Sequence, residues 1–130
     1  MPRTDPHPTE GELAILRVLW RLEAPATVRE VHDELLRAKD TAYTTVLRML
    51  TIMSDKKLVR RDESERSHRY VPLYTEPVVQ SSMLRRFVQN AFSGSAVKLV
   101  QSALADDGAS AEELEAIGKL IAQAKSRRKK

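Results

Sequence analysis

The sequence predicts a mainly α-helical fold with a small β-hairpin, arranged as a winged helix-turn-helix domain followed by a C-terminal helical module. Three observations predict it. Apolar residues recur at helical spacing in six segments, three of which begin with a capping box. A short basic hairpin follows the third helical segment directly. The region after residue 76 shows helical patterns throughout.

The composition limits the classes of protein to be considered. The 130 residues suffice for one domain or two small ones. The chain contains no cysteine, which excludes disulfides, cysteine-ligated zinc and iron–sulfur clusters. It has no apolar run of transmembrane length and no secretory signal pattern, so we expect a cytoplasmic protein that does not bind a membrane by itself.

The N-terminal segment predicts a lead-in followed by a helix. Residues 1–8 contain three prolines and are expected to be disordered. Thr9 and Glu12 then form a capping-box pattern, in which each side chain satisfies a backbone N–H at the helix start. The helix predicted over 10–22 has a wide apolar arc, so it is expected to be central and mostly buried.

Two further helices follow in close succession. Thr27 and Glu30 form a second capping box ahead of a helix to about residue 37, and another helix is predicted over 42–55. Because only a few residues connect these amphipathic helices, the pair matches a helix-turn-helix unit. Four apolar residues of the later helix are expected to face the core: Val46, Leu47, Leu50 and Met53.

The opposite face of the helix over 42–55 is polar. Its spacing places Thr44, Arg48, Thr51 and Asp55 on one side. Short hydroxyls and a guanidinium can reach base edges in a major groove. Four threonines between residues 41 and 51 are unfavourable for helix formation, which argues against a face that is merely solvated. The favoured interpretation is therefore a DNA-facing surface.

A basic hairpin is predicted after this helix, with strands over 58–62 and 68–73 and a turn at 64–67. Between residues 56 and 69 the chain carries six Lys/Arg and three Asp/Glu, whereas residues 1–75 as a whole are nearly neutral. Such a local positive stripe suits DNA phosphates. The same cations can instead discourage edge-to-edge strand pairing. The hairpin therefore supports DNA binding only together with the helix before it.

The C-terminal region is predicted to need a partner. Helical segments are expected over about 77–92, 96–105 and 110–124. These residues are too few to bury a self-sufficient core, and a second copy of the chain is the commonest partner. We therefore expect a dimerisation domain over 76–124 and a basic tail over 125–130. The expected interface residues are Leu84, Phe87, Val88, Phe92, Leu114, Ile117, Leu120 and Ile121.

The sequence carries no pattern of catalytic chemistry. No nucleophile elbow, Walker loop or dinucleotide fingerprint is present, so neither an enzyme nor a cofactor is expected. His7, His32 and His68 lack a second ligand at suitable spacing, which favours surface histidines over a metal site, with His68 placed to lie near phosphate. Tyr43 has two interpretations, a phosphate contact through its hydroxyl or packing on the first helix.

An ordered set of short motifs resembles a known family of bacterial regulators. The motifs are Thr9-x-x-Glu12-x-x-Ile15-x-x-x-Leu19-Trp20, Thr27-Val28-Arg29-Glu30-Val31, Ala42-Tyr43-Thr44-Thr45-Val46, Lys57-Leu58-Val59 and His68-Arg69-Tyr70-x-Pro72. Together they resemble the penicillinase repressor family of winged-helix transcriptional regulators (the BlaI/MecI/CopY group). The resemblance covers roughly residues 9–75, the expected DNA-binding domain.

The resemblance implies a homodimer that binds a palindromic operator and represses β-lactamase or other antibiotic-resistance genes until a membrane sensor-protease signals. It places the helix over 42–55 in the major groove and the hairpin on the DNA backbone. Together with the residue patterns, it gives these candidate DNA-binding residues: Tyr43, Thr44, Thr45, Arg48, Thr51, Lys56, Arg66, His68 and Arg69.

Two departures from the family pattern limit what is carried over. The absence of cysteine disfavours the copper-responsive branch. Ser102-Ala103 stands where the antibiotic-responsive members carry the Asn-Phe pair at which they are cut, so inactivation by cleavage stays open. Two alternatives to a specific repressor are a protein-interaction module and a sequence-blind DNA binder that relies on the tail over 125–130.

Overall fold

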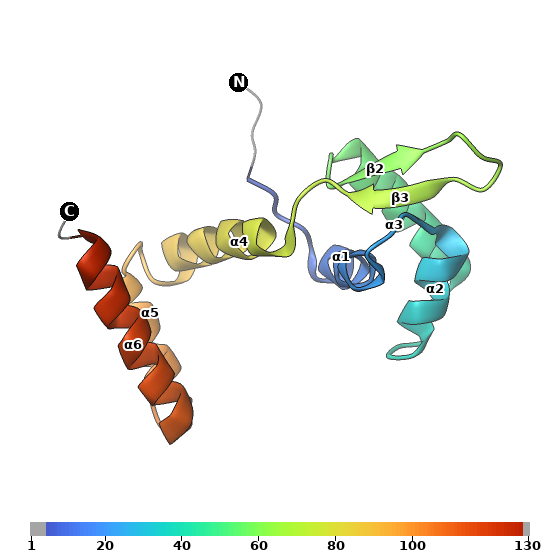
Figure 1. The fold of residues 1–130 in the computed structure, drawn as a ribbon. Coiled ribbons are helices and arrows are strands. Elements are labelled where there is room, and N and C mark those ends of the chain that lie inside the picture. The colour runs from blue at the N-terminus through green and yellow to red at the C-terminus, as the bar shows by residue number, and fades with distance from the viewer. Residues whose placement is uncertain (1–4, 129–130) are drawn as a thin grey trace. The chain divides into compact units, whose positions relative to one another are not determined.

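The computed structural model describes residues 5–128 (Figure 1). The chain divides into two compact units, Met1–Leu84 and Arg85–Lys130. Within the described residues no helix is long and apolar enough to cross a membrane. The elements are α1 (Glu10–Leu22), β1 (Ala26–Thr27), α2 (Val28–Leu36), α3 (Tyr43–Asp55), β2 (Val59–Asp62), β3 (Arg69–Pro72), α4 (Glu76–Ala91), α5 (Ala96–Leu104) and α6 (Ala111–Arg128).

The predicted capping boxes start the helices that they were expected to start. At α1 the Thr9 hydroxyl accepts the Glu12 N–H at 3.2 Å, and the Glu12 carboxylate accepts the Thr9 N–H at 2.9 Å. The same reciprocal pair begins α2, between Thr27 and Glu30. A third box, formed by Ser110 and its partner three residues on, begins α6. These local signals therefore set the helix starts.

The ends of the chain differ in part from the expectations. Of the predicted disordered lead-in, residues 1–4 lie outside the described residues, whereas Pro6 and Pro8 are described and buried. Of the predicted basic tail, residues 129–130 lie outside the described residues, and α6 continues through Arg128. Lysine and arginine are good helix formers and interact favourably with the C-terminal end of the helix dipole, so the helix does not stop at residue 124.

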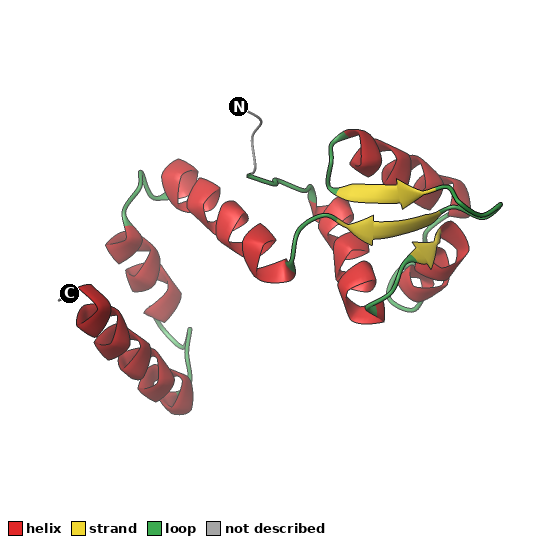
Figure 2. Ribbon diagram, turned by 45° about the horizontal axis from the view of Figure 1, so that its top comes forward, coloured by secondary structure: helices red, strands yellow, loops and turns green. Residues whose placement is uncertain are grey.

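The hairpin belongs to a sheet of three strands rather than two. The strand order is β1-β3-β2 and both pairings are antiparallel, with Ala26 opposite Tyr70 and Arg61 opposite Tyr70 on the other side. Figure 2 shows the third, short strand beside the hairpin. Two residues are too few to show the alternation by which a strand is recognised in a sequence. The added strand joins the hairpin to the start of α2.

Apolar side chains from α1, α2, α3 and the sheet form one core in the first unit. Val46, Leu50 and Met53 of α3 are fully buried, as predicted, and so is Tyr70 of β3 apart from 2% of its surface. The prediction for Leu47 was wrong, because this side chain is 42% exposed. One residue corresponds to about 100° around a helix, which places Leu47 at the edge of the buried stripe.

An ion pair between the buried Glu12 and the exposed Lys56 joins the start of α1 to the end of α3. Glu12 is only 5% exposed, and its carboxylate accepts a hydrogen bond from Lys56 Nζ at 2.7 Å in addition to the one from Thr9. Lys56 is the C-cap residue of α3. The pair therefore holds the C-terminal end of α3 in place, in a position that no spacing in the sequence indicates.

The second unit has a different character, because none of its described residues, 85–128, is buried. Phe87 and Phe92 make an edge-to-face ring contact with centroids 5.7 Å apart. Several large apolar side chains of this unit are about half exposed, including Phe87, Leu114 and Ile121. A region of helices without a buried residue leaves its apolar surface available to a partner.

We predict that Lys56→Met destabilises the protein by about 1–2 kcal/mol, because the nearly buried Glu12 carboxylate then keeps only part of its hydrogen bonding. Urea denaturation followed by circular dichroism measures the change in the free energy of unfolding. The neighbouring Lys57→Met is the matched control, since Lys57 is exposed and has no ion pair among residues 5–128. Equal losses in the two variants would contradict the assignment.

Candidate nucleic-acid interface

The polar face of α3 is exposed along its length. Thr44, Arg48, Thr51 and Asp55 are all exposed, on the side of the helix away from the buried stripe, while Thr45 is half-buried. The Thr51 hydroxyl donates a hydrogen bond to the Leu47 carbonyl at 2.9 Å. Arg48 has no ion-pair or hydrogen-bond partner within the described part of the chain, so its guanidinium is available to a ligand.

A polar groove of about 450 Å³ lies beside this face. Its walls come from the start of α2, from α3 and from the turn of the hairpin. Three of the predicted DNA-binding residues, Tyr43, Arg66 and His68, meet there. The full lining is Thr27, Val28, Arg29, Tyr43, Leu47, Arg66, Ser67, His68 and Tyr70. The fold thus brings together residues that are up to 43 positions apart in the sequence (27 to 70).

The Tyr43 ring packs against two side chains of α2. The Arg29 guanidinium carbon lies 5.9 Å from the centroid of the Tyr43 ring, a cation–π distance. The His32 ring meets the same ring edge-on with centroids 5.7 Å apart, and His32 Nε2 lies 2.7 Å from the Thr41 carbonyl oxygen. These contacts fix the start of α3 against α2, whereas the packing interpretation had named the first helix.

Arg29 is a groove residue that sequence reasoning missed. It stands in the first turn of α2, is exposed, and lines the groove with Arg66. Its only signal is its position at the start of the first helix of a helix-turn-helix pair, where the exposed N–H groups and a cation both favour an anion. A search restricted to the third helix and the hairpin could not find it.

The cations predicted to bind DNA differ in how they are held. Arg69 lies within 3.5 Å of the Glu30 and Glu65 carboxylates and 3.4 Å from the Pro25 carbonyl oxygen, so it ties β3 to α2 and to the residue just before β1. Lys56 is bound to Glu12, as described above. By contrast, Arg66 has no ion-pair partner among residues 5–128. Of the three, Arg66 is the cation that can bind a phosphate without first breaking a contact.

The hairpin is itself held by short-range electrostatics. The Asp62 carboxylate accepts the Ser64 N–H at 3.0 Å, and this hydrogen bond holds the pKa of Asp62 below its ordinary value. A hydrogen bond to Tyr70, followed by the charge of Glu63 at 2.6 Å, raises the pKa of Arg61. These contacts rigidify the base of the turn, while the residues at its tip, from 64 to 68, stay exposed.

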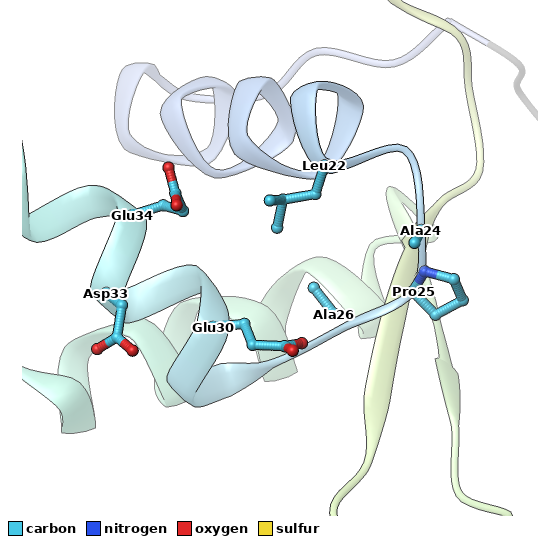
Figure 3. Close-up of a pocket in the computed structure, with 7 residues that line it drawn as sticks. All are labelled: Leu22, Ala24, Pro25, Ala26, Glu30, Asp33 and Glu34. Carbon is cyan, nitrogen blue, oxygen red and sulfur yellow. The ribbon is translucent and has the colours of Figure 1, made fainter.

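A second hollow on the first unit has the opposite charge. It lies between the end of α1 and α2 and is lined by Glu30, Asp33 and Glu34 of α2 together with Leu22 and the Ala24–Ala26 segment (Figure 3). Three carboxylates suit phosphate less well than the groove beside α3 does, although Glu30 and Glu34 are already paired with Arg69 and Arg21. The described residues contain no group of three or more side chains placed to hold a metal ion. The charge distribution thus singles out the groove beside α3 as the surface that suits nucleic acid.

These features define the class of protein as one with a winged helix-turn-helix domain. Among solved structures, the chain is similar to a MarR family protein from Bacillus stearothermophilus, with a TM-score of 0.50 and 19% identity over 98% of this chain and 79% of that chain. A second similar structure is the ferric uptake regulator from Francisella tularensis, with a TM-score of 0.47 and 13% identity over 73% of this chain and 86% of that one. At such identities the first likeness shows the fold alone.

The sequence itself shows the family. Residues 8–123 match the model of the penicillinase repressor family, and the chain belongs to that family. It is 38% identical over 85 residues to the transcriptional regulator BlaI of Mycobacterium tuberculosis, in both strain CDC 1551 / Oshkosh and strain H37Rv. The match covers 65% of this chain and 62% of the length of these relatives, which are transcriptional regulators.

Proposed function

We propose that this protein is a homodimeric transcriptional repressor that binds a palindromic operator in a sequence-specific manner. The observation that carries the proposal is the exposed polar face of α3 beside the groove lined by Arg29, Arg66 and His68. Phosphate contacts position a protein on DNA, and base contacts give the sequence preference. One surface here offers groups of both kinds. Such a repressor acts in the cytoplasm.

The residues of the surface divide by the contact that each can make. Arg48, flanked by Thr44 and Thr51, faces base edges, where a guanidinium can bind a guanine with two hydrogen bonds. Thr45 is half-buried and contacts DNA from the edge of this face. Arg66, His68 and the Tyr43 hydroxyl contact phosphates, as does Arg29. Lys56 and Arg69 contribute less to phosphate binding than Arg66, because carboxylates of the same chain already hold them.

The dimer is proposed to form through the helices that follow the winged-helix domain, with residues 9–75 assigned to DNA binding and 76–124 to dimerisation. Among the eight predicted interface residues, Leu84, Phe87, Leu114, Leu120 and Ile121 are between 46% and 61% exposed, and Val88, Phe92 and Ile117 are half-buried. Symmetric pairing would cover these apolar surfaces in a second copy. It would also place two α3 helices on the two halves of an inverted repeat.

Membership of the penicillinase repressor family supports a target class as well. We propose that the regulated genes are of the β-lactamase and antibiotic-resistance type, and that a membrane sensor-protease relieves repression. Ser102 and Ala103 lie within α5, one of the helices of the proposed dimerisation domain. Cleavage in that helix would act on operator binding by way of the dimer rather than by altering the groove.

The experiment that tests the function is selection of bound fragments from genomic DNA by the purified protein at physiological salt. A short inverted repeat upstream of a few genes is the expected result, and the neighbouring genes would identify the regulated pathway. Fragments without a common sequence would overturn the proposal in favour of a sequence-blind DNA binder or a protein-interaction module.

With the selected operator, the two kinds of contact can be separated. Arg48→Ala is expected to weaken specific binding by about 1–3 kcal/mol, because a contact to a base edge is lost. Arg66→Ala is expected to weaken binding to all sequences alike and to reduce the slope of log K against log salt by about 0.9, since one phosphate contact disappears. Fluorescence anisotropy titrations at several salt concentrations measure both effects.

Arg17→Ala is the matched control for these two variants, because Arg17 is exposed on α1 outside the groove. Its affinity and salt slope should equal those of the unaltered protein. If Arg48→Ala lost affinity for operator and unrelated DNA equally, the assignment of α3 to base recognition would be wrong.

The dimer has a separate test. Phe87→Glu and Ile121→Glu each place a charge where the proposed interface buries an apolar side chain, so both are expected to shift the protein from dimer to monomer. Sedimentation velocity measures the change. Gln123→Glu adds the same charge at an exposed polar position of α6 and should stay dimeric. Dimers in all three variants would place the interface elsewhere.

A further inference from the structure

Leu47 is an apolar side chain on the DNA-facing side of α3. It is 42% exposed, unlike the neighbouring stripe of Val46 and Leu50, which is fully buried. Tyr43 and Thr51 stand four residues before and after it, so the three side chains form a row on the helix surface. An exposed leucine on its own is ordinary. Because Leu47 lies among the residues proposed to contact DNA, we expect its side chain to contact DNA as well.

The groove around Leu47 is mostly polar. Arg29, Arg66 and His68 line it together with Leu47, and these side chains suit phosphate oxygens. A leucine supplies neither charge nor a hydrogen bond. Its contribution to binding therefore comes from apolar surface that a ligand removes from water.

Thr51 extends this apolar character along the row. Its hydroxyl donates to the Leu47 carbonyl at 2.9 Å, so the proton is already engaged and the hydroxyl can only accept a further hydrogen bond. The methyl group of Thr51 remains as its other contact group. Leu47 and Thr51 thus form a short, mostly apolar row beside the polar pair of Thr44 and Arg48.

Among the four possible base pairs, the edges exposed in the major groove carry one kind of apolar group, the 5-methyl group of thymine. We propose that Leu47 reads the 5-methyl group of a thymine in each operator half-site, an inference that rests on the proposed function. Arg48 then recognises its base by hydrogen bonds, while Leu47 distinguishes thymine from cytosine, which lacks the methyl group. The specificity of α3 has two chemically different components.

The test removes one partner of the contact at a time, either the 5-methyl group of thymine or the side chain of Leu47 beyond its Cβ atom. Each thymine of the selected operator is replaced in turn by deoxyuridine, which lacks only that methyl group, and each duplex is titrated with the unaltered protein and with Leu47→Ala. At one position per half-site, deoxyuridine should weaken binding by the unaltered protein about fourfold, the factor equivalent to about 0.8 kcal/mol for one methyl group. Leu47→Ala should lose affinity for the thymine duplex and show no further loss with deoxyuridine.

Leu36→Ala is the matched control, because Leu36 lies at the end of α2 with nearly the same exposure, 43% against 42%. It should respond to deoxyuridine as the unaltered protein does. If the losses from Leu47→Ala and from deoxyuridine were additive at every thymine, the inference would be overturned while the repressor function stood. If the unaltered protein preferred no sequence at all, the proposed function would fail instead.

Discussion

The burial of one apolar stripe on α3 determines what the first unit presents to a partner. Val46, Leu50 and Met53 are fully buried against the other helices and the sheet, which fixes the rotation of the helix about its axis. The opposite face, with Thr44 and Arg48, is then necessarily exposed. The same packing brings the start of α2 and the turn of the hairpin together with α3, where they line one groove. The proposed DNA-binding surface follows from the core.

Much of this arrangement could be predicted from the sequence, because its signals are local. A capping box needs residues three positions apart, and the stripe of α3 needs only one helix. The features that escaped prediction depend on distant residues. Arg29 becomes a groove residue only when α2 is placed against Tyr43, and Lys56 is held by Glu12, 44 positions away. The prediction that Leu47 faces the core failed for a different reason. This residue lies at the edge of the buried stripe, where periodicity does not decide burial.

The positive charge of the hairpin is partly neutralised within the protein. Arg69 and Arg61 are paired with carboxylates of the first unit, so much of the positive charge of the hairpin is neutralised within the protein. Arg66 has no ion pair within the described residues, and neither do Lys57 and Arg60. In the proposed function, sequence preference then depends on the contacts that α3 makes with base edges.

The central claim is that α3 lies in the major groove, and the absence of cysteine allows a direct measurement. Thr44→Cys introduces a single thiol on the proposed reading face, and Asp33→Cys introduces one in the acidic hollow. Each variant is mixed with operator duplexes that carry a disulfide-tethered base in the major groove, and cross-links form by thiol–disulfide exchange. The account predicts that Thr44→Cys cross-links and that Asp33→Cys does not. Cross-linking by Asp33→Cys alone would contradict it.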